Sequence, residues 1–143
     1  MPSELIQIAD AVVAALNATP FTMPFTAERH YQPVFDLAEM KDLHVSVVPR
    51  GAEITQVARA KGTFDHKVDV AVQKKFVKGD AAELDPLVAL AEEIAESFRA
   101  KRLPGMPDAA WVKTEHAPVY ALEHMQELRQ FTSVMTLTFR VTR

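Results

Sequence analysis

Residues 132–141 read TSVMTLTFRV, which is the most regular strand pattern in the chain. Alternate positions in it are mostly apolar, and they are Ser133, Met135, Leu137, Phe139 and Val141. Side chains alternate between the two faces of a sheet, so this pattern predicts a strand with one face in the core. Such a strand suits the centre of a sheet, which we favour, or an edge that pairs with another chain.

A second alternating stretch lies upstream, at residues 66–76. Val68, Val70 and Val72 face one way, and charged or polar side chains lie between them. This alternation is typical of an antiparallel strand with one solvated face. Four weaker strands are predicted at 25–31, 43–47, 54–59 and 111–115, and the first is expected at a sheet edge because Pro24 cannot donate to a ladder.

Two turn signals divide the region before the valine strand. Pro49-Arg50-Gly51 combines a fixed φ with a residue that tolerates positive φ, so it predicts a turn between strands 43–47 and 54–59. Lys61-Gly62 is expected to end the weaker of these two strands. The sequence thus predicts a poorly packed hairpin or arm over residues 50–66, which projects from the sheet.

Two amphipathic helices complete the pattern. The first follows Ser3, a predicted N-cap, and carries apolar residues at helical spacing up to Leu16. The second is predicted to begin at Asp85-Pro86, as an N-cap followed by proline at the first helical position, and to end near Arg99, Lys101 and Arg102. Its apolar stripe consists of Leu87, Leu90, Ala91, Ile94 and Phe98. A helical turn at 36–42 and a brief helix at 120–128 are also expected.

The order of these elements indicates an α+β fold. With 143 residues, the chain has the length of a single domain, 1–143. Two helices can cover one face of a mainly antiparallel sheet, and this arrangement gives a two-layer domain. We therefore predict two layers, with both helices packed on the same face of the sheet.

Composition narrows the classes of function. The chain has 16 basic and 19 acidic residues, without the basic excess that nucleic-acid binders usually show. It has four glycines, which leave little room for a phosphate-binding loop, and no cysteine for disulfides, thiolate zinc sites or a nucleophile. We therefore expect no cofactor and no sequence-specific contact with nucleic acid.

The N-terminal segment gives no targeting signal. Its early charged residues are Glu4 and Asp10, whereas a secretory signal begins with positive charge. No apolar run approaches the ~18 residues of a membrane span. We expect a protein without a membrane partner that is made in the cytoplasm.

Catalytic patterns are weak. Glu123-His124-x-x-Glu127 could place His124 and Glu127 on one helix face, and His116 could join them, which leaves a small metal-dependent hydrolase as one alternative. His66 and Asp69 differ by an odd number and would point to opposite faces of a strand. No serine lies in a Gly-x-Ser-x-Gly elbow. We predict no enzyme activity and no catalytic, metal-binding or cofactor-binding residue.

Charge is segregated along the middle of the chain. Residues 50–78 hold seven basic and three acidic groups, whereas residues 79–98 hold six acidic groups and no basic one. These segments are either two solvated surfaces or two patches that meet between neighbouring copies of the chain. We place the predicted contact surface on the basic segment, at Arg50, Ile54, Val57, Arg59, Lys61, Phe64, Lys74 and Lys75.

Two stretches also resemble known proteins. They are PFTAERHYQPVFDLAEMKDLHVSVVPRGAEITQVARAKGTFDHKVDVAVQKKF, residues 24–76, and LEHMQELRQFTSVMTLTFRV, residues 122–141. Both resemble small proteins from the neck and tail gene clusters of tailed bacteriophages. Within such clusters, the size and element order are similar to the tail-terminator, or tail-completion, family.

This resemblance implies a two-layer α+β domain with helices against a curved sheet. It implies a structural virion protein that forms a homohexameric ring, caps the tail tube, stops its growth and presents a surface to the head-completion or connector protein. The partners would be other copies of the chain, the tail tube protein and that connector. Assembly would occur in the host cytoplasm. A head-closure or neck adaptor protein is the main alternative.

Overall fold

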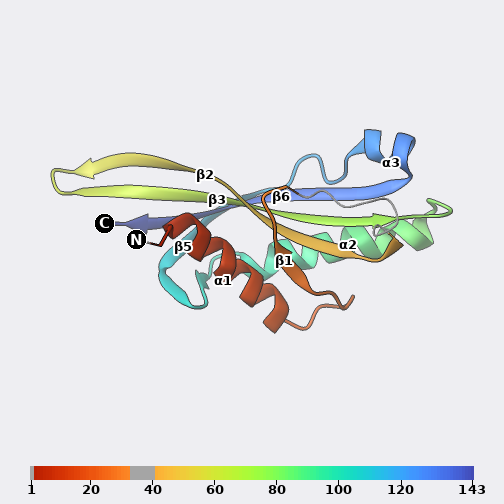
Figure 1. Ribbon diagram of the computed structural model, residues 1–143, viewed down its shortest axis with the longest axis horizontal. Helices are drawn as coiled ribbons and strands as arrows, with labels where there is room; N and C mark the ends of the chain where they lie inside the picture. Colours follow the sequence, from red (N-terminus) through yellow and green to blue (C-terminus); the bar gives the residue numbers. More distant parts are fainter. Residues whose placement is uncertain (1, 33–40) are drawn as a thin grey trace.

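The computed structural model describes residues 2–32 and 41–143. Within this part of the chain, three helices accompany a curved six-stranded sheet with the order β1-β2-β3-β6-β5-β4 (Figure 1). The elements are α1 (Glu4–Ala18), β1 (Ala27–Arg29), β2 (His44–Ala58), β3 (Lys61–Lys75), α2 (Ala81–Phe98), β4 (Arg102–Leu103), β5 (Met106–Glu115), α3 (Leu122–Leu128) and β6 (Gln130–Thr142).

The sheet is mixed. β1 runs parallel to β2 at one edge, and all other neighbours are antiparallel. The predicted α+β class with a mainly antiparallel curved sheet is therefore confirmed. The helical turn predicted at 36–42 lies mostly outside the described residues.

β3 and β6 form the centre of the sheet. Their register runs without interruption from Thr63 opposite Thr142 to Lys75 opposite Gln130. β2 lies on the other side of β3, and β5 lies on the other side of β6. The strand that the TSVMTLTFRV pattern predicted is thus an inner strand, as expected.

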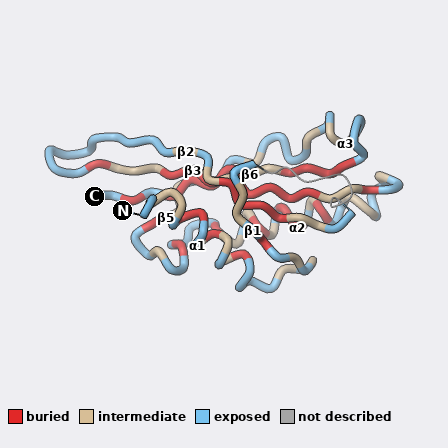
Figure 2. The backbone as a smooth tube through the Cα atoms, viewed as in Figure 1, coloured by how far each residue is buried: buried red, intermediate tan, exposed pale blue. Residues whose placement is uncertain are grey.

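The core lies between the sheet and the helices. Val68, Val70 and Val72 of β3 share one hydrophobic core with alternate residues of β6 and with the apolar stripes of α1 and α2. Figure 2 shows that buried residues run along the middle of the sheet and occur on both of these helices. Phe98 of α2 meets Phe139 of β6 edge to face, with ring centroids 6.2 Å apart. The predicted stripe of α2 is therefore its core-facing side, because Leu87, Leu90, Ala91, Ile94 and Phe98 are its buried residues.

The predicted start of α2 was wrong. The helix begins at Ala81, and Asp80 is its N-cap, with its carboxylate accepting from the Glu83 N–H at 3.1 Å. Pro86 lies inside the helix. The predicted end was also too late: Arg99 is the C-cap, and Arg102 belongs to β4. Asp85-Pro86 has the chemistry of a helix start, but Asp80 offers the same cap one turn earlier.

The predicted turn at Pro49-Arg50-Gly51 was wrong as well. β2 continues through these residues, and the register shifts between Pro49 and Gly51, so that Arg50 has no partner on β3. One unpaired residue in an antiparallel pair is a β-bulge, which bends a strand without ending it. Strands 43–47 and 54–59 are therefore one strand, and Lys61-Gly62 opens β3 rather than ending its predecessor.

Gly79 occupies a backbone conformation that favours glycine. Its φ is +71°, and an added Cβ would lie 2.9 Å from Cε2 of the Phe76 ring. We expect Gly79→Ala to lower the free energy of unfolding by about 1–3 kcal/mol, because it combines a left-handed alanine with a clash. Urea denaturation measures this loss. Gly51→Ala is the matched control, since nothing lies within 4 Å of its added Cβ; equal losses in both variants would contradict the argument.

Glu83 fastens the turn that precedes α2. Its carboxylate accepts from the N–H groups of Val77, Lys78 and Gly79, at 3.0, 2.8 and 2.8 Å. These hydrogen bonds, that of Val77 foremost, lower the pKa of Glu83 below its ordinary 4.5. A carboxyl with a lowered pKa in the folded state stabilises the protein above its unfolded pKa, and this contribution is lost as pH falls through the folded pKa.

Glu83→Gln should therefore lower the free energy of unfolding at pH 7, and the difference from wild type should shrink as pH falls below 4.5. Urea denaturation at a series of pH values measures both effects. Asp65→Asn serves as a comparison for the loss of stability at low pH, because the pKa of Asp65 is also lowered, in this case by Arg140. A difference between Glu83→Gln and wild type that stays constant with pH would show that the titration of Glu83 is not involved.

Candidate assembly surfaces

The hairpin of β2 and β3 extends past the helices at one end of the molecule (Figure 1). We call residues 51–67 the hairpin arm. Residues 52–61 are all exposed, and two of them are large and apolar: Ile54 is 67% exposed and Val57 is 56% exposed. Arg59 and Lys61 flank the tip at Ala60. The arm tip therefore presents apolar and cationic side chains together, which suits contact with another protein surface.

One edge of the arm is open. β1 pairs with β2 only at Val45, Ser46 and Val47. In the described chain, no strand pairs with residues 51–58 on that side. An unpaired edge with exposed apolar residues is able to pair with another chain.

The last residues of β6 line the β3 side of the arm almost to its tip, because β6 pairs with β3 up to Thr142 opposite Thr63. Gly62 and Arg143 exchange backbone hydrogen bonds of 2.9 and 3.0 Å, and the Arg143 guanidinium lies 3.9 Å from the centre of the Phe64 ring. Arg140 donates to both carboxylate oxygens of Asp65, at 2.7 and 2.9 Å, which lowers the pKa of that carboxyl. The arm is therefore three strands wide from the body up to Gly62, and only the residues around Ala60 extend past β6.

The N-terminus is fastened to the arm where it leaves the body. Nε2 of the buried His66 lies 2.7 Å from Oε1 of Glu4, in the first turn of α1. The other oxygen of Glu4 lies 3.3 Å from Nε of Arg143. His66 thus has a structural partner in α1, where the sequence had indicated only that it and Asp69 point apart.

The predicted contact residues do not form one surface. Ile54, Val57, Arg59, Lys61 and Phe64 all lie on the arm. Arg50 lies at the bulge and is held over the sheet, with Nη1 2.9 Å from Thr136 Oγ1 and 3.5 Å from Asp69 Oδ1. Lys74 and Lys75 end β3. An extended strand rises about 3.3 Å per residue, so these two lysines lie roughly 45 Å from the tip.

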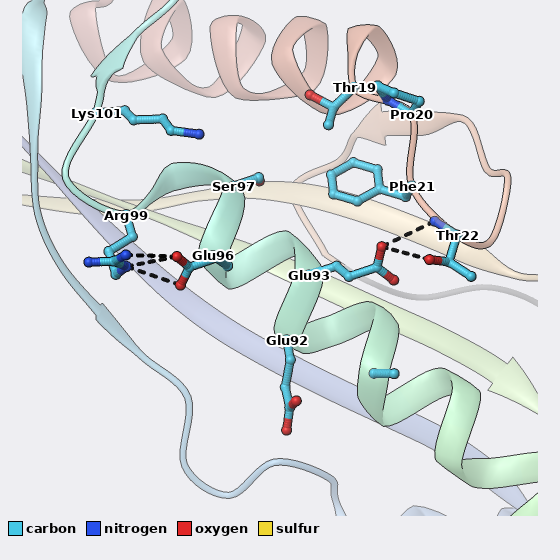
Figure 3. A pocket seen from close by; sticks show the side chains of 11 residues that line it. Thr19, Pro20, Phe21, Thr22, Glu92, Glu93, Glu96, Ser97, Arg99 and Lys101 are labelled. Atoms are coloured by element: carbon cyan, nitrogen blue, oxygen red, sulfur yellow. Dashed lines mark hydrogen bonds and ion pairs between the residues drawn. The ribbon is translucent and has the colours of Figure 1, made fainter.

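A groove lies between α2 and the loop that follows α1 (Figure 3). Its volume is about 810 Å³, and we call it the α2 groove. It is lined by Thr19, Pro20, Phe21, Thr22, Ala89, Glu92, Glu93, Glu96, Ser97, Arg99 and Lys101. Glu93 fixes the loop, because its Oε1 accepts from the Thr22 N–H at 3.2 Å and the Thr22 hydroxyl at 2.9 Å. The sequence had indicated the acidic side of α2 but not this loop.

The opposite end of the molecule from the arm also exposes apolar side chains. α3 has no buried residue, and its Leu122 and Leu128 are exposed. Val77 and Tyr120, close to α3 in the fold, are exposed too. The sequence predicts the brief helix but not its uncovered apolar side chains. The signal that could have revealed them is a short helix with a leucine at each end.

The histidines of the metal alternative are held apart. Nε2 of His116 contacts the Ser133 hydroxyl at 2.7 Å, whereas Nδ1 of His124 contacts the Thr132 hydroxyl at 2.8 Å. Successive residues of a strand point to opposite faces, so the two imidazoles bind opposite sides of β6. Burial lowers the pKa of His116. Among residues 2–32 and 41–143, no group of three or more metal-ligating side chains converges, and no helix is long and apolar enough to cross a bilayer.

Comparison with known proteins defines the fold. No protein-family model and no curated protein sequence matches the chain. Among solved structures, it is similar to the sheath/tube terminator of PVC, an extracellular contractile injection system, in its extended state. The similarity covers 100% of this chain and 58% of that chain, with a TM-score of 0.53 and 14% identity. The chain therefore has a tail-terminator-like fold and spans a little over half the length of that neighbour.

Proposed function

We propose that this chain is a structural terminator that ends the tube of a phage-tail-like particle. The observation that carries the proposal is the likeness of fold, over the whole chain, to a sheath/tube terminator. The terminator function of that neighbour also favours this role over a head-closure adaptor at the same neck. In this proposal the protein belongs to the tail of the particle, is assembled in the host cytoplasm and works without catalysis.

The proposed mechanism is steric. Six copies form a ring whose one face reproduces the interface between tube subunits and whose other face lacks it, so that no further tube subunit can add. The two ends of the molecule expose different surfaces, which this polarity requires. The arm tip exposes Ile54 and Val57 with cations, whereas the α3 end exposes Leu122 and Leu128 with charges of both signs, namely Glu123, Glu127, Lys78 and Arg129. The far face then binds the head connector.

Tube polymerisation tests the proposal. The tube protein of the same particle is polymerised with and without this chain, and tube lengths are measured by negative-stain electron microscopy. We expect added protein to stop elongation and to be found as a ring at one end of each tube. An unchanged length distribution, with no protein at the tube ends, would overturn the proposal.

A further inference from the structure

The α2 groove combines an apolar wall with carboxylates. Pro20 and Phe21 supply the apolar wall from the loop, and Ala89 supplies it from α2. Glu92 and Glu96 line the groove and are exposed (Figure 3). Their helical spacing from Ala89 places the three residues on one side of α2. This pairing of apolar and acidic surface calls for an occupant that is apolar and basic.

The charge of the groove is only partly neutralised from within. Glu96 forms an ion pair with Arg99 at 2.9 Å, and Glu93 accepts a hydrogen bond from the Thr22 hydroxyl. Lys101 adds a cation at one end, so that three carboxylates face two cations. Residues 79–98 as a whole carry six acidic groups and no basic one.

The arm tip has the complementary chemistry. It offers the exposed Ile54 and Val57 with the cations Arg59 and Lys61. In its own chain the arm points away from α2 (Figure 1), so one molecule does not fill its own groove. We propose that the arm tip of one copy docks in the α2 groove of the next copy, which names the contact between subunits of the ring and so rests on the proposed function.

Size and symmetry agree with this contact. Sites that bury a ligand have volumes of about 300–1,000 Å³, so 810 Å³ accommodates the side chains of a hairpin tip but not the whole arm. The tip and the groove are different surfaces, which makes the contact heterologous. Contacts of this kind form a closed ring when the rotation between copies closes.

Cross-linking between single cysteines tests the contact directly, because the chain has no cysteine of its own. Ala60→Cys marks the tip and Ala89→Cys marks the groove. Ala82→Cys is the matched control, since Ala82 is exposed on α2 two turns before Ala89 and outside the groove. Equal amounts of a tip variant and a groove variant are mixed and treated with a short bismaleimide. The reaction is run once with the proteins in solution at high concentration and once with the proteins bound to tubes.

We expect about tenfold more cross-linked dimer from the Ala60→Cys and Ala89→Cys mixture than from the mixture with Ala82→Cys, because docking raises the local concentration of the two thiols. Equal yields in the two mixtures, both in solution and on tubes, would overturn the inference. Cross-linking of the Ala89→Cys thiol to the tube protein instead of a second copy would overturn it as well.

Charge reversal gives a second measurement. Arg59→Glu with Lys61→Glu reverses the charge of the tip, and Glu92→Lys with Glu96→Lys reverses the charge of the groove. Glu93 is left unchanged because it holds the loop. We expect each variant to lose at least about tenfold in self-association. A mixture of the two variants retains one good tip and one good groove and should stop at dimers. A chain with all four substitutions should recover association, and failure of both mixture and recovery would contradict the docking.

Failure of this inference differs from failure of the proposed function. Tubes that are capped by a protein without the tip-to-groove cross-link would leave the terminator proposal standing and overturn only the docking. A specific tip-to-groove cross-link in a protein that has no effect on tube length would support the docking and overturn the terminator proposal.

Discussion

Phe98→Ala should lower the free energy of unfolding by about 3–5 kcal/mol, the usual cost of removing a large buried aromatic side chain. Phe98 is 5% exposed, and its ring meets that of Phe139 edge to face. Truncation leaves a cavity between α2 and β6 and also removes this ring contact. Urea or guanidinium denaturation, followed by circular dichroism, measures the change.

Phe98→Leu is the matched control, because it keeps most of the volume and should cost less than about 1.5 kcal/mol. A loss below about 1 kcal/mol for Phe98→Ala would mean that the core described above does not depend on this helix end. Similar losses for both variants would point to the ring contact, rather than the cavity, as the main stabilising interaction.

Reversing both cations of the arm tip, with Arg59→Glu and Lys61→Glu, should abolish control of tube length while leaving thermal unfolding of the monomer unchanged. Both side chains are exposed, and surface substitutions away from packed features usually change stability by less than about 0.5 kcal/mol. The measurements are the melting temperature of the monomer and the length distribution of tubes assembled with the variant. Tubes of scattered, mostly excessive length are expected.

Lys41→Glu with Lys113→Glu is the matched control, since it reverses two exposed cations outside the arm. These variant proteins should cap tubes as the wild type does. Normal tube lengths with the tip variant would show that the arm is not the assembly surface. Loss of capping in both variants would indicate a general dependence on net charge rather than a contact at the tip.

The regular strands could be predicted because their signal is local and repeated. Apolar and polar residues alternate over many positions in β6 and β3, and the buried positions follow the same two-residue period. The bulge at Arg50 could not be told from a turn, because Pro49 and Gly51 suit both and only pairing with β3 decides between them. The start of α2 was predicted wrongly for a related reason. Asp80 and Asp85 both have the chemistry of an N-cap, and the hydrogen bonds that Glu83 accepts from the N–H groups of residues 77–79 favour the earlier one.

The positions of the candidate surface residues followed from the sequence only in part. Weak strand patterning pointed to Ile54, Val57, Arg59 and Lys61, and the structure places all four exposed on the arm; their role in a contact stays a prediction. Lys74 and Lys75 were grouped with them by sequence distance, but a straight strand carries them to the other end of the sheet. The α2 groove could not be predicted, because it depends on a contact between Thr22 and Glu93, which are 71 residues apart.

The central place of β3 has a mechanical consequence. This strand runs from the arm to the start of α2 and is hydrogen-bonded to β2 on one side and to β6 on the other. Its ladder bonds lie perpendicular to the strand. A pull applied at the arm tip along the strand therefore loads the ladders in shear, and many bonds must break together before the strand slips. A force on the tip therefore moves the arm and the body of the molecule together, and the hydrogen bonds where the arm leaves the body stay intact.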